Sequence, residues 1–183
     1  MYKGMWSHSK AYGKGKLVDP TAKTKYVGDF VRDQKEGFGK QSEEKGTYKG
    51  NFMKGKYHGS GSIQWTNGAA YTGDWCNGVI EGFGEFYWPT ENKQYLGRFH
   101  NNEMLGFGVM QWGDGRKFTG SWIGERKHGY GVYEKADGSS ISGTWVHNRQ
   151  CGYGIYVSST GNRKYGAWSN GKKVETLTEA KAK

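Results

Sequence analysis

Residues 71–84 read Tyr-Thr-Gly-Asp-Trp-Cys-Asn-Gly-Val-Ile-Glu-Gly-Phe-Gly and contain the two phrases from which the chain is built. The first phrase is an aromatic residue, a glycine two positions later, and Trp or Phe two positions after that. It begins at residues 2, 26, 48, 71, 95 and 118, and in a weaker form with Ile at residue 141. The second phrase, Gly-x-Gly, begins at residues 13, 37, 59, 82, 106, 129 and 152. A fixed period of 22 to 24 residues marks a repeat array, so function is expected on an extended surface rather than in one pocket.

Both phrases have the alternation of β-strands. Since residues i, i+2 and i+4 share a face, Tyr71, Gly73 and Trp75 are predicted on one face, and Gly82, Gly84, Phe86 and Trp88 on one face of the next strand. Glycine in a strand marks the close approach of a bulky group, here a neighbouring ring. Asn-Gly and Asp-Gly pairs supply the positive φ of tight turns, as in Thr66-Asn67-Gly68. Each repeat is therefore predicted to be one β-hairpin.

The predicted fold is all-β, an elongated single-layer antiparallel meander of consecutive hairpins that is twisted into a trough. The array is expected over residues 1–171, and its last half-copy at residues 164–168 lacks the leading aromatic residue. Residues 172–183 are expected to be a tail, either a short helix or disordered, which could cap the other edge of the sheet. The strand at residues 2–6 is predicted to be an open edge, through which two copies could pair.

The charge is strongly basic and uneven. The 183 residues have a formal net charge of +10, made up of +7 in residues 1–60, −2 in residues 61–124 and +5 in residues 125–183. Five lysines near the N-terminus are candidates for contact with anionic lipid: Lys10, Lys14, Lys16, Lys23 and Lys25. The alternative is a solvated rim that prevents edge-to-edge aggregation. Nucleic-acid binding is not favoured, because the aromatic residues are already required by the repeat.

The face opposite the Tyr/Gly/Trp residues holds a second candidate surface. The middle residue of Gly-x-Gly is apolar in the C-terminal half, which gives the candidate partner contacts Phe83, Phe107, Tyr130 and Tyr153. Val109, Val132 and Ile155 follow on the same face. A single layer cannot cover both of its faces, so this strip predicts an interface with a helix or extended segment of a protein partner. Closure of the trough over the strip, or cover by the tail, are the alternatives.

Three tryptophans near strand ends, Trp65, Trp88 and Trp112, are candidate contacts on the first face, where internal packing is the alternative. No constellation suggests catalysis, and we expect neither enzymatic activity, nor a metal, nor a cofactor. His58 and His128 lie three repeats apart, and Gly-x-Gly opens no helix, so it is no dinucleotide loop. Two isolated cysteines and the absence of a signal-peptide pattern at the N-terminus predict a soluble intracellular protein.

The two phrases together resemble MORN repeats, whose pattern runs approximately Tyr-x-Gly-x-Trp-x-x-Gly-x-x-x-Gly-x-Gly. Seven copies in register carry the resemblance, and residues 71–84 fit it best; Ile141 and Gln41 depart from it. The resemblance implies a single-layer twisted sheet and a scaffold or adaptor in a cytoskeletal or ciliary assembly. We therefore expect a cytoplasmic, cytoskeletal protein of the cilium or flagellar axoneme. A peripheral adaptor that binds anionic phospholipids or phosphoinositides through its basic ends is the alternative.

Overall fold

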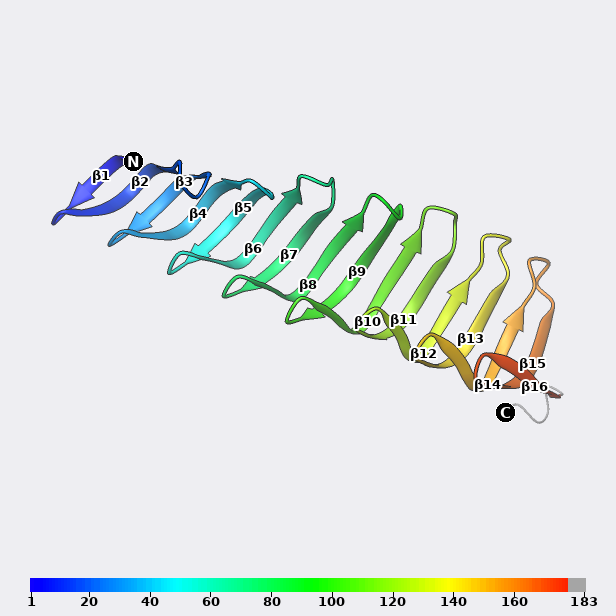
Figure 1. Ribbon diagram of the computed structural model, residues 1–183. Coiled ribbons are helices and arrows are strands. Elements are labelled where there is room, and N and C mark those ends of the chain that lie inside the picture. Colours follow the sequence, from blue (N-terminus) through cyan, green and yellow to red (C-terminus); the bar gives the residue numbers. More distant parts are fainter. Residues whose placement is uncertain (178–183) are drawn as a thin grey trace. The chain divides into compact units, whose positions relative to one another are not determined.

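The computed structural model describes residues 1–177 and contains sixteen strands, which follow one another in chain order (Figure 1). They belong to two compact units, residues 1–89 and 90–183. The first unit holds β1 Tyr2–Ser7, β2 Lys10–Asp19, β3 Thr24–Val31, β4 Gln34–Glu43, β5 Gly46–Met53, β6 Lys56–Trp65, β7 Ala70–Cys76 and β8 Val79–Trp88. The second holds β9 Lys93–His100, β10 Glu103–Trp112, β11 Lys117–Ile123, β12 Arg126–Glu134, β13 Ser140–Val146, β14 Arg149–Val157, β15 Arg163–Ser169 and β16 Lys172–Leu177.

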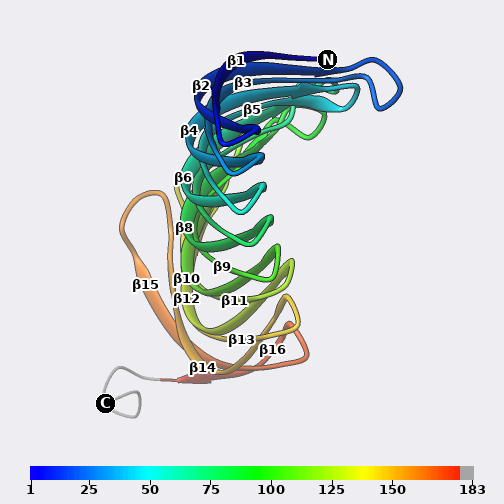
Figure 2. The same cartoon turned by 90° about the vertical axis from the view of Figure 1, so that its left-hand side faces the viewer.

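Within each unit, every strand pairs antiparallel with the next, so the predicted all-β meander of hairpins is confirmed. The strands curve along their length, as Figure 2 shows. The seven predicted repeats supply the hairpins β1–β2 to β13–β14. Positive φ at Asn77 and Gly78, 52° and 91°, gives the tight turn that the Asn-Gly pair predicts.

The predicted aromatic face is the core of each unit. Tyr26, Tyr48, Tyr71, Tyr95 and Phe118, which open the first phrase, are 0–1% exposed. Four of them, Tyr26, Tyr48, Tyr95 and Phe118, meet the closing ring of their own phrase and that of the next. The Tyr95 ring, for example, lies 5.2 Å from Phe99 and 5.8 Å from Trp122, both edge to face. Such pairs contribute about 0.5–1.5 kcal/mol each beyond the area they bury.

Hydrogen bonds fix these rings in place. The Tyr95 hydroxyl donates to the carbonyl of Arg98 at 3.2 Å, and the Tyr48 hydroxyl donates to that of Asn51 at 2.9 Å. The indole of Trp122 donates through Nε1 to the carbonyl of Gly108 at 3.2 Å. The tyrosine ring therefore runs along its own strand and lies over glycines: a Cβ at Gly108 would be 2.3 Å from the Tyr95 Oη. This is the close approach that the sequence predicts for the second glycine of Gly-x-Gly.

The first glycine of Gly-x-Gly has a different role, and the prediction that Gly82 shares the face of Gly84 is wrong. Gly82 has a φ of +82°, and a Cβ there would meet Asp74 on the opposite face. All seven first glycines have φ between +61° and +85°. In all seven hairpins of the repeats the register shifts at this point, for example between Gly28 and Asp29, where β4 has two extra residues. The first glycine is thus a β-bulge residue, which needs glycine for its backbone conformation.

For residues 172–177 the prediction of a short helix or disorder is wrong, whereas the prediction that this segment could cap the edge of the sheet is confirmed. These residues form β16, which pairs with β15 from Ser169↔Lys172 to Tyr165↔Leu177. The reason is that β15 would otherwise present a row of unpaired backbone groups, which a following extended segment satisfies. The rest of the predicted tail, residues 178–183, lies outside the described residues.

Candidate functional site

The outer face, meaning the side of each sheet opposite the buried rings, carries the predicted apolar strip in the second unit. Phe107, Tyr130 and Tyr153 are 62%, 66% and 72% exposed. The strand register places them opposite Ser121, Thr144 and Ala167 respectively. Because each large ring faces a small side chain across the ladder, its surface stays open to solvent.

A second row of side chains runs beside these three rings. It crosses all eight strands of the second unit, one residue a strand, in the order Leu96, Val109, Thr119, Val132, Ser142, Ile155, Tyr165 and Leu177. Its members are small or apolar, and none is charged. We call this row together with Phe107, Tyr130 and Tyr153 the apolar strip. The predicted juxtaposition of Val109, Val132 and Ile155 with the rings is present in the structure.

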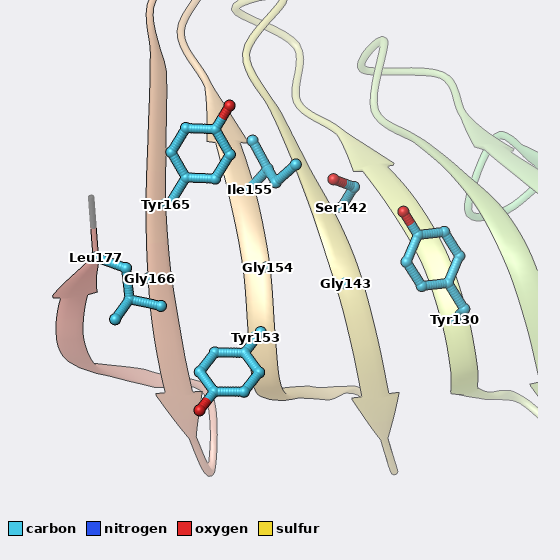
Figure 3. A pocket seen from close by; sticks show the side chains of 9 residues that line it. All are labelled: Tyr130, Ser142, Gly143, Tyr153, Gly154, Ile155, Tyr165, Gly166 and Leu177. Carbon is cyan, nitrogen blue, oxygen red and sulfur yellow. The ribbon is translucent and has the colours of Figure 1, made fainter. Parts of the chain in front are cut away.

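A pocket of roughly 160 Å³ lies at the β12–β16 end of the apolar strip (Figure 3). Tyr130, Tyr153, Ile155, Tyr165 and Leu177 contribute its side-chain walls. Small-molecule sites usually have about 300–1,000 Å³, so this one is too small for them. It has room for one apolar side chain of a partner. Hot-spot residues of protein interfaces typically fill desolvated pockets of this kind.

Phe83, the remaining predicted ring contact, lies in the first unit. It is 53% exposed, and its backbone N–H donates to the Asp74 carboxylate at 3.0 Å. Thr72 and Glu85 stand opposite each other beside it. Within its own unit Phe83 is therefore an exposed ring among polar neighbours and not part of an apolar row.

The three predicted tryptophan contacts are half-buried in ring clusters of the core face. Phe86 stacks on both Trp65 and Trp88, with ring centroids 5.3 and 4.1 Å apart. Trp112 lies edge to face with Tyr133 at 6.3 Å, and the Arg116 guanidinium is 5.4 Å from its ring centroid. Internal packing, the alternative named for these tryptophans, thus accounts for much of their surface.

Sequence reasoning missed the position two residues before each Gly-x-Gly, whose side chain covers the core rings. Tyr57 occupies it in the third repeat and stacks on Tyr48 with centroids 3.8 Å apart. Lys35 occupies it in the second repeat, 5.4 Å above the Tyr26 ring, and donates a hydrogen bond to Gln41. This contact explains why the repeat tolerates the polar Gln41. The signal was available, because this position has the same odd-even parity as the core-facing residues after the bulge, as Lys35 has with Gln41.

Lys127 holds the same position in the sixth repeat and lies in a cage of four rings. Its Nζ is 4.1 Å from the ring centroid of Tyr133, 5.1 Å from Trp145, 5.4 Å from Phe118 and 5.5 Å from Trp112. Burial, reinforced by the charge of Arg116, lowers the pKa of the Lys127 ammonium to about 8. The ring faces attract the cation and oppose this shift in part.

We expect Lys127→Met to raise the free energy of unfolding by about 1 kcal/mol at pH 7, since a buried charge is replaced by an apolar chain of similar volume. Met104 occupies this position in the preceding repeat and is buried. The wild-type pKa is depressed from 10.5 in the folded state, so the unfolded state binds more protons between pH 8 and 10.5. The contribution of Lys127 to the free energy of unfolding of the wild type therefore rises with pH between pH 8 and 10.5, so the difference in stability between Lys127→Met and the wild type becomes smaller.

Urea unfolding of both proteins at pH 7.0 and 9.5 tests this expectation. The difference between the proteins is the quantity to follow, because burial raises the pKa of Tyr48 and Tyr95 to about 12 in both. Those tyrosines lower stability above pH 10 equally in the two proteins. A constant difference between the two pH values would show that Lys127 does not titrate in this window.

The five lysines predicted to contact anionic lipid do not form one cluster. Lys14 is ion-paired with Asp29 at 2.7 Å, and Lys23 with Glu44 at 2.9 Å. Lys10 stands opposite Ser7 at the start of β2, and Lys25 opposite Val18 and Ser42. Lys16 is exposed and stands opposite Lys3 and Val27.

Other chemistry is sparse in the part of the chain that the structure describes. Residues 1–177 contain no group of three or more His, Cys, Asp or Glu side chains placed to hold a metal ion. Cys76 and Cys151 are free thiols. Among the described residues, no helix is long and apolar enough to span a membrane.

Comparison with known proteins identifies the repeat. The MORN repeat matches at residues 2–21, 26–42, 48–70, 71–93, 95–115, 118–140 and 142–163. Alsin from Rattus norvegicus, Mus musculus and Homo sapiens is 40% identical over 45 residues, which are 25% of this chain and 3% of alsin. The chain thus spans a small fraction of the length of these relatives. Among solved structures, the TCP domain of SAS-4 (dCPAP) from Drosophila melanogaster, in complex with a proline-rich motif of Ana2 (dSTIL), is 10% identical, with 90% of each chain covered and a TM-score of 0.40.

Proposed function

The chain belongs to the MORN-repeat family, and from this premise we propose that it is a non-catalytic scaffold or adaptor that holds a protein partner on the apolar strip. The observation that carries the proposal is the exposure of Phe107, Tyr130 and Tyr153 along one face of the second unit. Aromatic rings that stay rigid and open are suitable anchors, because a partner buries much area while few rotamers are frozen.

The spacing of the rings defines what a partner segment must look like. Phe107, Tyr130 and Tyr153 lie on β10, β12 and β14, so successive rings are two strands, or about 9.6 Å, apart. Residues i and i+7 of an α-helix are about 10.5 Å apart along its axis. An amphipathic helix that crosses the strands can therefore place one apolar side chain beside each ring. An extended segment can do so with every third residue if it adopts the polyproline II conformation, which has three residues a turn and rises about 3.1 Å a residue.

The pocket beside Tyr153 and Tyr165 gives such a segment a fixed register. An apolar side chain of the partner that enters it would be desolvated on several sides, whereas its neighbours would lie on the open strip. We propose that this pocket takes the anchor residue of the partner.

The cellular setting of the proposal rests on the family resemblance. We propose a cytoplasmic, cytoskeletal assembly, with the cilium or flagellar axoneme as first choice. We also propose that the chain has no catalytic activity: the hydroxyls of the buried core tyrosines donate hydrogen bonds to backbone carbonyls, as in the bond from Tyr95 to the carbonyl of Arg98. Self-association through β1, the first strand of the first unit, is part of the proposal, because an edge strand recruits another strand.

We expect the double variant Phe107→Asp/Tyr130→Asp to weaken binding of the partner at least about 30-fold, since losing a hot-spot ring costs about 2 kcal/mol or more. The partner is first identified by cross-linking to the full chain in native extract, and its affinity is then measured with purified components. Circular dichroism verifies that the variant keeps its β-sheet.

The matched control is Ile123→Asp/Val146→Asp, because these side chains are also exposed, at 49% and 42%, but lie at the far ends of β11 and β13. The control should bind within twofold of wild type. If the strip variant binds the partner as tightly as the control variant does, the apolar strip is not the binding surface; the fold would be unaffected by that result.

The membrane alternative is weaker on this geometry. Two of its five lysines, Lys14 and Lys23, already have carboxylate partners. The membrane alternative would be supported if the chain bound anionic vesicles and this binding weakened with added salt and with charge reversal at Lys14, Lys16 and Lys23.

A further inference from the structure

Four lysines form a straight row on the outer face of the first unit. The strand register places Lys3 opposite Lys16, and Lys40 opposite Lys49. Val27 on β3 joins the two pairs, since it stands opposite both Lys16 and Lys40. The row therefore crosses β1 to β5 with one residue a strand, and we call it the lysine row.

The lysine row lacks internal compensation. All four lysines are exposed, and none makes an ion pair with another residue among 1–177. Lys14, which lies two residues before Lys16 on the same face of β2, differs from the four, because it pairs with Asp29 at 2.7 Å. Like charges directly opposite each other in a sheet are destabilising. An anionic occupant would relieve this repulsion in both pairs at once.

The surroundings of the row define the shape of that occupant. Asp29 and Glu36 stand opposite each other on the same face, next to the row. Val27 and Phe38 are also exposed there, at 46% and 52%. The uncompensated positive charge is therefore a narrow band, made up of the row and of exposed Lys25, two residues from Val27 on β3. Acidic groups lie on the opposite flank, and two apolar side chains in the band can be covered by an occupant.

We propose that the first unit binds an extended, acidic segment of a protein along the lysine row, at right angles to the strands. The row covers four strand spacings, about 19 Å, which an extended chain spans with about six residues. A line of carboxylates matches a line of ammonium groups. A bilayer presents a plane of phosphates instead, which would be pressed against Asp29 and Glu36. This surface lies in a different unit from the apolar strip and does not depend on the function proposed for the strip.

Fluorescence anisotropy with a labelled octaglutamate peptide and the full chain tests the proposal. We expect wild-type protein to bind octaglutamate, but not octaglutamine, with an affinity that falls as salt is raised. Lys16→Glu/Lys40→Glu should weaken binding about tenfold or more, because two attractions of up to about 1 kcal/mol each become repulsions.

The matched control is Lys45→Glu/Lys56→Glu, which changes the net charge equally at exposed lysines outside the row. It should bind within about twofold of wild type. Lys3→Glu/Lys49→Glu gives an independent reversal of the same row should the first variant lose its β circular dichroism. Phe107→Asp/Tyr130→Asp should bind octaglutamate like wild type, which separates this proposal from the one on the apolar strip.

Three results would overturn the proposal. They are no binding of octaglutamate, equal losses in the row and control variants, and preferential binding of phosphatidylserine vesicles over the peptide. The last result would assign the row to a membrane surface.

Discussion

Replacing Gly108 by alanine is expected to lower the free energy of unfolding by about 3 kcal/mol or more. The added Cβ would lie 2.3 Å from the Oη and 2.5 Å from two ring carbons of Tyr95. That ring cannot yield, because it is fully buried, is bonded to the carbonyl of Arg98 and is flanked by Phe99 and Trp122. Either the strands separate locally or the ring leaves the core.

The prediction is measured by urea unfolding, followed by circular dichroism and tryptophan fluorescence. Gly124→Asn is the control: Gly124 has a φ of +58° and no atom within 4 Å of a built Cβ, and Asn tolerates that conformation. It should cost only a few tenths of a kcal/mol. A Gly108→Ala midpoint equal to that of the control would mean that the tyrosine ring does not depend on this glycine for space.

The hairpins and their buried face follow from the sequence because two local signals agree. The period-2 pattern of Tyr71, Gly73 and Trp75 defines a strand face, and the Asn-Gly turn that follows defines the register of the hairpin. The exposed rings Tyr130 and Tyr153 then follow by elimination, since they have the opposite parity in their strands.

The two glycines of Gly-x-Gly show where this reasoning ends. The second glycine is needed because a ring lies directly over it, and the first because its backbone has a positive φ, yet the sequence shows the same residue type at both positions. Only the paired structure separates the two causes. The register shift that results also decides which side chains meet across strands.

The lysine row is the clearest consequence. Sequence proximity groups Lys10, Lys14 and Lys16, whereas the register groups Lys16 with Lys3 and places Lys40 opposite Lys49. Charge that is diffuse along the chain becomes a line on the sheet. The cage around Lys127 has the same origin, because its four rings come from β10, β11, β12 and β13.

Removing the Tyr95 ring should be as damaging as crowding it. Tyr95→Ala is expected to cost about 3–5 kcal/mol, because it leaves a cavity over Gly97 and Gly108 and removes the contacts with Phe99 and Trp122. Tyr95→Phe should cost only about 1 kcal/mol, the net value of the hydrogen bond to Arg98. The sixth repeat supports this difference, since Phe118 takes the same position there and is 0% exposed.

The double variant Tyr95→Ala/Gly108→Ala tests whether the glycine and the ring form one unit. If Gly108 is required only because the ring lies over it, the new methyl group enters the cavity left by Tyr95→Ala. The double variant should then cost about as much as Tyr95→Ala alone, which is a coupling of about 3 kcal/mol between the two sites. Additive losses would show that Gly108 is needed for its backbone rather than for the ring. In that case the aromatic residue and the glycine of the repeat would be selected independently, and the close approach of ring and strand would not be what fixes their spacing.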